Sequence, residues 1–325
     1  MPDRWELRAR GVNGATSARL PSDAGGEKGG IAAAGVPMGR PGRHALPGAR
    51  GAVKGGMDRH DLAKLILVRL DAEGPRIRAD FNSPRGTRTR HAVVDDLLPA
   101  EIAHRIHAAF GDGSAFLRRD SFRERKKTLA KLDRLPAIAA EISYAIQDPA
   151  VVAKVGELTG MERLEPDASL YAGGLSMMTR GDFLNPHIDN SHDAARERYR
   201  RLNLLYYVTP DWREENGGNL ELWDDHVRTP VTLTSKFNRL AIMETNKHSM
   251  HSVSPVVADG ARTCVSSYYF SEISPDGSEY FHVTSFSARP EQGLLRAVSA
   301  VDAAARNVAG RVLGLGRGKD EVNQG

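Results

Sequence analysis

After residue 165 the sequence is a succession of short runs rich in β-branched and aromatic residues. The runs are LNLLYYVTP (202–210), GNLELWD (218–224), NRLAIMET (238–245), MHSVSPVV (250–257) and TCVSSYYF (263–270). Each run predicts a strand, and the Pro-Asp, Asn-Gly-Gly, Phe-Asn and Asp-Gly signals between them predict turns. Regular short strands without intervening helices are typical of an antiparallel sandwich or barrel, so this half of the chain is predicted to be β.

The region before it, from Met57 to about residue 164, is predicted to contain more helix than strand. Apolar residues recur at helical spacing in LPAEIAHRIHAAF (98–110) and in LPAIAAEISYAI (135–146). DPAVVAKVGELTG (148–160) begins with an Asp cap and a Pro and ends with a Gly, which marks both ends of a helix. The basic stretch RRDSFRERKK (118–127) predicts a solvated helix face, with an entrance for an acidic substrate as the alternative.

The two ends of the chain differ in character from this patterned region. Residues 1–56 contain 13 of the 32 glycines and have no sustained apolar periodicity, so we expect a disordered basic tail; alternatively, Met57 is the true start. The domain is expected to span 57–290, with helical support at 57–164 and a β core at 165–290. Residues 291–325 are expected to form a C-terminal helix followed by a frayed end.

Charge and cysteine content exclude several classes of function. The tail has nine basic against four acidic residues, whereas the rest of the chain has 36 against 37. The fold therefore has no general basic excess, and we expect no nucleic-acid partner. The single cysteine, Cys264, excludes an intrachain disulfide and a Cys-rich zinc module, so a metal here must be held by His and carboxylate. The absence of any run of about 18 apolar residues predicts no membrane span, and we expect a cytoplasmic protein.

A candidate metal site begins in the segment LNPHIDNSHD (184–193). Residues i and i+2 of a strand point to the same side, so His187 and Asp189 present an imidazole and a carboxylate together. His-x-Asp by itself is weak evidence, because the same spacing arises by chance in polar turns. Farther along the chain, SMHSVSPV contains His251, the candidate third ligand, with His248 as the alternative. Two histidines and one carboxylate on one face of an octahedron are diagnostic of non-heme Fe(II) oxygenases.

Arg262 lies 11 residues beyond His251, at the start of the strand TCVSSYYF. An arginine fork pairs bidentately with a carboxylate better than a lysine does. A dicarboxylate that chelates a metal at one end needs such a partner at the other. The order His-x-Asp, His, Arg on an all-β half is therefore a specific arrangement, although a structural salt bridge is the alternative role of Arg262.

With these residues the sequence resembles the 2-oxoglutarate/Fe(II)-dependent dioxygenase superfamily, in particular its prolyl 4-hydroxylase-like branch. The resemblance is strong over about residues 165–272 and looser in the helical part before it. Its motifs occur in the order GDFLNPHIDN, RRLNLLYYVTPDW, ENGGNLELWD, FNRLAIMET, SMHSVSPV and RTCVSSYYF. The resemblance implies a double-stranded β-helix (jelly roll) core with the N-terminal helices packed on it.

The resemblance also implies roles for individual residues. His187, Asp189 and His251 match the iron ligands, and Arg262 matches the partner of the distal 2-oxoglutarate carboxylate. Tyr207 and Asn203 are expected to line the same cofactor pocket, with plain barrel lining as the alternative. Two positions depart from the pattern, because Met178 replaces the usual Tyr near that pocket and Ser252 replaces the Gly that often follows the distal His.

The activity implied is that of an Fe(II)- and 2-oxoglutarate-dependent dioxygenase, with ascorbate as a further cofactor to be tested. Such an enzyme releases succinate and CO2 while it hydroxylates an unactivated C–H bond. The expected substrate is a prolyl residue of a protein, an amino acid or another small molecule. The alternative is a non-catalytic jelly-roll binding module that has lost iron, although the presence of all three ligands and Arg262 favours the enzyme.

Overall fold

The computed structural model describes residues 57–292, apart from 168, 172 and 225. The α-helices are α1 (Arg59–Asn82), α2 (Ala100–Ala108), α3 (Ala137–Ile146) and α4 (Pro149–Thr159), and the 3-10 helices are η1 (Leu132–Arg134) and η2 (Glu214–Asn216). The strands are β1 (His91–Val94), β2 (Leu117–Asp120), β3 (Glu124–Leu129), β4 (Glu165–Pro166), β5 (Gly174–Thr179), β6 (Phe183–Ile188), β7 (Tyr199–Tyr207), β8 (Leu220–Trp223), β9 (Pro230–Leu233), β10 (Arg239–Glu244), β11 (His251–Val253), β12 (Ala261–Ser271) and β13 (Ser285–Phe286). The predicted tail at 1–56 and the predicted helix after residue 292 lie outside the described residues.

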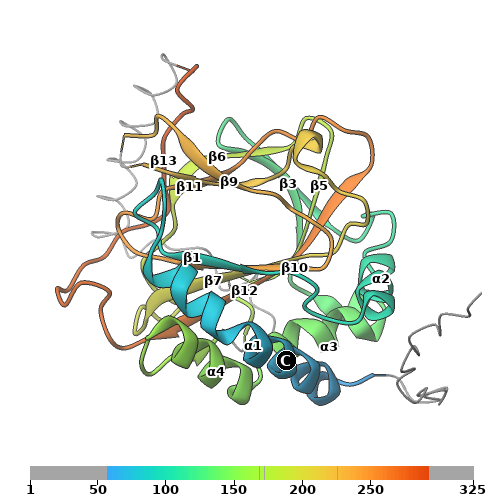
Figure 1. Cartoon of the computed structure of the whole chain (residues 1–325). Coiled ribbons are helices and arrows are strands. Elements are labelled where there is room, and N and C mark those ends of the chain that lie inside the picture. The colour runs from blue at the N-terminus through green and yellow to red at the C-terminus, as the bar shows by residue number, and fades with distance from the viewer. Residues whose placement is uncertain (1–56, 168, 172, 225, 293–325) are drawn as a thin grey trace, which may run out of the picture. The chain divides into compact units, whose positions relative to one another are not determined.

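The strands from β5 to β12 form a jelly roll of two facing layers (Figure 1). One layer has the order β5-β12-β7-β10, with β1 added at its edge, and the other has the order β6-β11-β8-β9. Successive strands from β5 to β12 thus alternate between the layers, except that β8 and β9 pair with each other in one layer. Every pairing among the described strands is antiparallel. The predicted fold class, mainly β with a jelly-roll core and helices packed on it, is confirmed.

The long strand β7 shows how side-chain alternation separates the two cores. Leu202, Leu204 and Tyr206 belong to the large apolar cluster shared with the helices. Tyr207 belongs to a smaller cluster that also contains Leu222 and is made of β7, β8, β10 and β12 residues. Because neighbouring residues of a strand point to opposite faces, one strand contributes to both the helix-facing core and the barrel interior.

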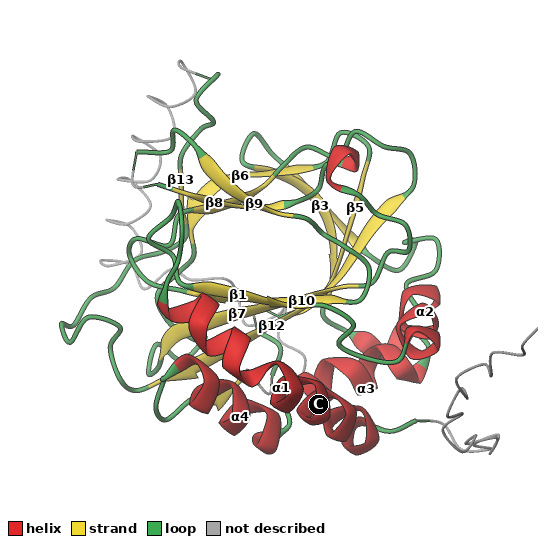
Figure 2. Cartoon of the chain, in the orientation of Figure 1, coloured by secondary structure: helices red, strands yellow, loops and turns green. Residues whose placement is uncertain are grey.

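The helices α1, α3 and α4 lie on the outer side of the layer that contains β7 and β12 (Figure 2). The side chain of Asp58 caps α1 by accepting from the backbone N–H groups of His60 and Asp61. The three helices predicted at 98–110, 135–146 and 148–160 are confirmed as α2, α3 and α4. Among the described residues, no helix combines the length and the apolar content that crossing a bilayer requires.

The basic stretch 118–127 is not a helix face, and that prediction is wrong. It forms the β2–β3 hairpin, and β3 pairs with both β5 and β6, so that it joins the two layers. Arg118 of the hairpin forms an ion pair with the buried Asp182, which lies in the turn between β5 and β6. The charge pattern alone could not identify a strand, because the pairing that stabilises it comes from β5 and β6, some 50 residues farther along the chain.

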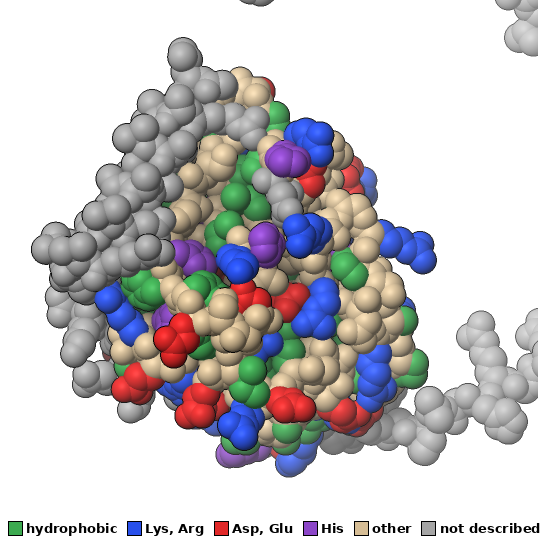
Figure 3. Space-filling model, turned by 90° about the vertical axis from the view of Figure 1, so that its left-hand side faces the viewer, with side chains coloured by type: hydrophobic (Ala, Val, Ile, Leu, Met, Phe, Trp, Pro, Cys, Tyr) green, Lys and Arg blue, Asp and Glu red, His purple; other side chains and the backbone are tan. Residues whose placement is uncertain are grey.

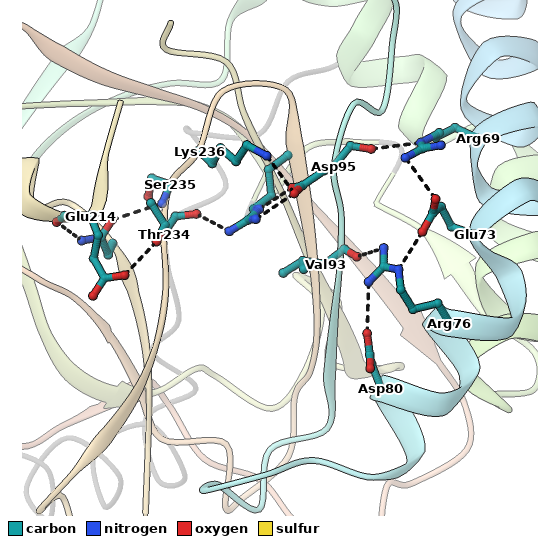
Figure 4. A network of polar contacts seen from close by, with 12 residues as sticks. Arg69, Glu73, Arg76, Asp80, Val93, Asp95, Glu214, Thr234, Ser235 and Lys236 are labelled. Atoms are coloured by element: carbon teal, nitrogen blue, oxygen red, sulfur yellow. Dashed lines mark hydrogen bonds and ion pairs between the residues drawn. The ribbon is translucent and has the colours of Figure 1, made fainter. Parts of the chain in front are cut away.

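A network of polar contacts connects α1 to the jelly roll (Figure 4). Asp95 accepts from the guanidinium of Arg239 at 2.5 and 2.9 Å and from Lys236 at 3.0 Å, and its backbone carbonyl accepts from Arg69 of α1. Ser235, which directly precedes Lys236 in the loop between β9 and β10, is fully buried. The network thereby stabilises the position of a loop that reaches the candidate site described below.

Candidate active site

Three of the predicted site residues come together between β6 and β11. His187 and His251 are direct cross-strand partners, with ring centroids 4.2 Å apart, and Asp189 follows the last residue of β6. The Nε2 of His187 is 3.4 Å from one Asp189 carboxylate oxygen, and the Nε2 of His251 is 3.6 Å from the other. One potential ligand atom from each residue lies within 4.8 Å of the others, which is a spacing that a single metal ion can bridge. His248 is exposed and is not part of this cluster.

Backbone hydrogen bonds fix the orientation of both imidazoles. The Nδ1 of His187 lies 2.9 Å from the carbonyl of Asn185, and the Nδ1 of His251 lies 2.9 Å from the carbonyl of Ser249. A carbonyl only accepts, so each Nδ1 carries the proton and each Nε2 presents a lone pair toward Asp189. Donation from the second ring nitrogen to a carbonyl is the arrangement that usually orients a metal-ligating histidine.

The charges around the cluster favour the protonation states that metal binding requires. Burial lowers the pKa of His251 to about 4, so this imidazole is neutral at pH 7. Burial by itself raises the pKa of Asp189, but the positive charge of Arg200 and the two histidines outweigh it and hold the pKa well below its usual range. The neutral imidazole of His251 and the ionised carboxylate of Asp189 are therefore available as donors beside His187, and a donor set of two imidazoles and one carboxylate fits a divalent transition metal.

Arg200 and Asn203 lie beside the carboxylate of Asp189. The guanidinium of Arg200 is 3.2 Å from Asp189 Oδ2, and the side-chain amide of Asn203 donates to the same oxygen at 2.7 Å. Arg200 also stacks on the ring of Tyr268, with its guanidinium carbon 4.3 Å from the ring centroid, and is 3% exposed. Asn203, predicted to line the cofactor pocket, thus contacts the carboxylate of the metal cluster.

Arg200 is a site residue that the sequence pattern did not reveal. Strict alternation along β7 puts residues 200 and 203 on opposite faces. The pairing of β7 with β12 shifts register between Leu202 and Arg200, where an extra residue is inserted into β7. Such a bulge reverses the alternation locally and turns Arg200 toward the same carboxylate as Asn203. No local signal marks the bulge.

Arg262 is a buried cation among neutral groups. It is 3% exposed, and its guanidinium lies 3.4 Å from the hydroxyls of Ser235 and Ser176 and 3.8 Å from the sulfur of Met178. None of the described carboxylates forms an ion pair with it. A charged group in such surroundings is costly unless an anion completes the site.

Tyr207 and Met178 both lie next to Arg262. Tyr207 lies beneath it, with the guanidinium carbon 4.7 Å from the ring centroid. Burial raises the pKa of Tyr207 to about 12, and its hydroxyl has no hydrogen-bond partner among the described residues. Met178, the position at which relatives often have Tyr, is the direct strand partner of Arg262 and touches it through sulfur. That Tyr207 contacts a cofactor stays a prediction.

The metal cluster and Arg262 line one cavity of about 1030 Å³. His187, Asp189, His251, Arg262 and Asn203 all contribute to its wall, together with residues of the β2–β3 hairpin. Figure 3 views the side of the molecule on which β13 lies, where histidine, lysine and arginine side chains lie close to hydrophobic and acidic side chains on the surface. The cavity is large enough for two small organic molecules, since ligand sites of this kind occupy about 300–1,000 Å³.

The segment that follows β12 packs against the cluster, which the sequence pattern did not predict. The two-residue strand β13 pairs with β6, so that Phe286 stacks on His187 at a centroid distance of 5.1 Å. The Nε2 of His282 lies 2.6 Å from the backbone carbonyl of Asp189.

Arg289 pairs with Glu221, to which Ser252 also donates. Ser252, which stands where related sequences often have Gly, therefore points away from the cluster. It links β11 to β8 and to Arg289.

Comparison with known families agrees with this arrangement. Residues 173–270 match the model of the 2OG-Fe(II) oxygenase superfamily, and this segment contains all three residues of the cluster and Arg262. The chain is thus similar to the 2OG-Fe(II) oxygenase superfamily over this segment, which is less than half of its length.

Individual relatives are more distant. Over 84 residues the chain is 34% identical to prolyl 3-hydroxylase OGFOD1 of Xenopus laevis, which is 24% of this chain and 16% of that protein. The chain thus spans about one sixth of the length of this relative. A prolyl hydroxylase from Trichoplax adhaerens, solved with a hypoxia inducible factor peptide, is 16% identical with a TM-score of 0.46, covering 69% of this chain and 99% of that one. A Phytophthora capsici prolyl 4-hydroxylase is also 16% identical, with a TM-score of 0.46 and 84% coverage of both chains.

Proposed function

We propose that the protein is an Fe(II)- and 2-oxoglutarate-dependent dioxygenase that hydroxylates an unactivated C–H bond. In this proposal His187, Asp189 and His251 hold the iron, and Arg262 binds the distal carboxylate of 2-oxoglutarate. The observation that carries the proposal is the buried guanidinium of Arg262, which has no carboxylate partner among the described residues and faces the same cavity as the His–Asp–His cluster.

The donor set supports iron as the metal. When bound, Fe(II) supplies the redox chemistry by which dioxygen oxidises a C–H bond while 2-oxoglutarate is converted to succinate and CO2. Three protein donors leave further coordination positions open for the cosubstrates. The protein's part is to position these groups: the backbone carbonyls of Asn185 and Ser249 orient the imidazoles, and Arg200 and Asn203 hold the Asp189 carboxylate in its ionised form.

Arg262 has a positioning role at the opposite end of the cosubstrate. Two carboxylate oxygens can accept in parallel from its guanidinium, which fixes both the distance and the plane of the bound molecule. Ser176 and Ser235 provide further hydroxyl donors beside it. Met178 cannot supply the phenol that relatives often have near this pocket, so these serines and Tyr207 are the available substitutes.

The substrate is proposed to be a prolyl residue, an amino acid or another small molecule, as the prolyl 4-hydroxylase-like sequence motifs imply. A cytoplasmic location belongs to the same proposal, because a chain with one cysteine gains no disulfide from an oxidising compartment. Ascorbate is included in the assay because the resemblance implies it.

The test is succinate formation from 2-oxoglutarate with Fe(II), dioxygen and ascorbate, measured without added substrate. We expect slow substrate-independent turnover by the wild-type protein and none by Asp189→Ala or His187→Ala, because each variant loses a metal donor. His248→Ala is the matched control and is expected to turn over normally. Normal succinate yield from Asp189→Ala contradicts the assignment of the ligands. A wild-type protein that binds neither Fe(II) nor 2-oxoglutarate is instead the non-catalytic binding module.

A further inference from the structure

The cavity wall carries a clear excess of positive charge. Among the described residues that line it, seven are lysine or arginine and three are aspartate or glutamate. Arg200 and Arg262 lie in the interior with Asp189, as described above. The other five basic residues are Arg119, Lys126, Lys131, Arg134 and Arg196, and the other two acidic residues are Glu124 and Asp193. We call these five basic residues the basic rim.

Both acidic side chains near the basic rim already have a basic partner. Glu124 pairs with Lys126 at 2.8 Å, and Asp193 pairs with Arg198 at 2.8 Å. Five basic against two acidic side chains give this part of the cavity wall a formal excess of three positive charges, although the chain from residue 57 onward is close to neutral. This local concentration differs from a general basic surface, because it coincides with the cavity.

Strand alternation explains how the hairpin contributes to the rim. Arg119 and Lys126 are direct partners across β2 and β3, as are Leu117 and Thr128, and all four line the cavity. Arg118, which has the opposite orientation, pairs with Asp182 and holds the hairpin against the β5–β6 turn. The basic residues of the stretch 118–127 are thus divided between a face directed at the cavity and a face that stabilises the hairpin.

Iron and 2-oxoglutarate do not neutralise the rim. A divalent cation and a dicarboxylate dianion carry opposite and equal formal charges, so loading both leaves the charge of the cavity unchanged. A cavity lined by one sign of charge raises the local concentration of ligands of the opposite sign. The remaining positive charge therefore acts on the second organic molecule, the substrate.

We propose that the basic rim binds a substrate that carries carboxylate or phosphate groups next to the C–H bond to be oxidised. This inference rests on the proposed function, since it concerns the substrate of the same cavity. The shared chemistry is an anionic group within reach of Lys131 and Arg134, which are exposed, and of the half-buried Arg119 and Arg196. An acidic peptide segment and a small organic anion are the two sources of such a group.

The experiment measures binding to the full chain loaded with Mn(II) and 2-oxoglutarate. Three labelled peptides of equal length, each with one central proline, differ only in whether the flanking residues are Glu, Gln or Lys. We expect the Glu peptide to bind about tenfold more tightly than the Gln peptide at low salt, with the difference decreasing as salt rises, and the Lys peptide not to bind. A hexose phosphate and inorganic phosphate test the small-anion source, first by displacement of the Glu peptide and then by direct calorimetry.

Charge reversal tests the location of the anion site. The double variant Lys131→Glu/Arg134→Glu is expected to lose about tenfold in affinity for whichever anion binds. Lys64→Glu/Arg213→Glu is the matched control, because it makes the same change in net charge at exposed residues that do not line the cavity. Far-ultraviolet circular dichroism and thermal unfolding establish that both variants are folded.

The outcomes separate this inference from the proposed function. Failure of the wild-type protein to bind Mn(II) and 2-oxoglutarate, measured first and without any peptide, contradicts the proposed function. If 2-oxoglutarate binds normally but the three peptides bind with equal affinity, the inference of an anionic substrate is contradicted and the proposed function is not. The same holds if 2-oxoglutarate binds normally and no anion binds. An equal loss of affinity in the rim variant and its control also contradicts the inference, because the effect is then one of net charge.

Discussion

Arg262 offers the most direct test at the scale of single residues. Replacing it with Gln removes the charge while keeping two polar atoms in a site whose other donors are hydroxyls. Charge-assisted hydrogen bonds are worth about 1.5–3 kcal/mol, so the KM for 2-oxoglutarate is expected to rise about 10- to 150-fold. The kcat at saturating 2-oxoglutarate is expected to change less, because the lost contact holds the cosubstrate equally before and during the reaction.

Arg180→Gln is the control for this prediction, since Arg180 is an exposed arginine whose partner, Asp259, is also exposed. Steady-state succinate formation at several 2-oxoglutarate concentrations gives both constants. An unchanged KM in Arg262→Gln supports the structural role that was the alternative for this residue.

The variant Asn203→Ala distinguishes two roles of this residue, orienting the Asp189 metal ligand and binding the cofactor. The amide of Asn203 donates to Asp189 Oδ2, so Asn203→Ala is expected to weaken metal binding about 10- to 100-fold, as is usual for groups that orient a ligand. The affinity for 2-oxoglutarate at saturating metal is expected to remain near that of the wild type. Calorimetric titration with Mn(II), followed by 2-oxoglutarate, measures both. The opposite result, a normal metal affinity with weak 2-oxoglutarate binding, supports the original prediction that Asn203 lines the cofactor pocket.

At the scale of residues, the order of the motifs along the chain predicted that His187, Asp189 and His251 lie together. Side-chain alternation predicted that His187 and Asp189 point to the same side. His187, Asp189 and His251 do form one cluster, because β6 and β11 are neighbours in the jelly roll. Arg200 could not be predicted, because a bulge in β7 reverses its orientation. Bulges depend on the pairing of two strands and leave no mark in the sequence of one.

At the scale of elements, Arg289 and β13 hold the segment after β12 against the metal cluster. Arg289 forms two hydrogen bonds with Glu221, and both side chains are about one tenth exposed. Removing one partner of a buried ion pair usually costs about 3–5 kcal/mol, so Arg289→Met is expected to lower the free energy of unfolding by about this amount. Urea unfolding followed by tryptophan fluorescence measures the change, because Trp223 donates to Ser252 in the same network.

The double variant Glu221→Met/Arg289→Met is the control for that prediction. It leaves no uncompensated charge, and its stability is expected to recover most of the loss. If the double variant is as unstable as Arg289→Met, the loss comes from packing of the long arginine side chain and not from the ion pair.

Elements with internal periodicity were predictable, and elements defined by distant pairing were not. The helices α2, α3 and α4 have apolar spacing or end signals of their own, and the structure confirms them. The β2–β3 hairpin was mistaken for a helix face, because its charged residues alternate between the cavity and Asp182. The strand β13 has two residues, which is too short for any periodicity.

At the scale of the whole molecule, Asp95 connects α1 with the strands of the jelly roll (Figure 4). Hydrogen bonds from Arg239, with a further contribution from Lys236, lower the pKa of Asp95 from 3.8 to about 2, although burial acts in the opposite direction. A carboxyl group with a lowered pKa in the folded state stabilises the fold above the pKa of the unfolded state. That contribution is lost as the pH falls through the lowered value.

The difference in unfolding free energy between wild type and Asp95→Asn is therefore expected to be constant near neutral pH and to shrink as the pH falls from 3.8 toward about 2. Urea unfolding of both proteins at a series of pH values measures it. In the background of Arg239→Gln the same substitution is expected to have a smaller and less pH-dependent effect, because the main cause of the lowered pKa is gone. A difference that stays constant down to the lowest accessible pH, or that persists fully without Arg239, contradicts this role of Asp95. The network would then hold the helix against the sheet through shape alone, and its charges would be incidental to stability.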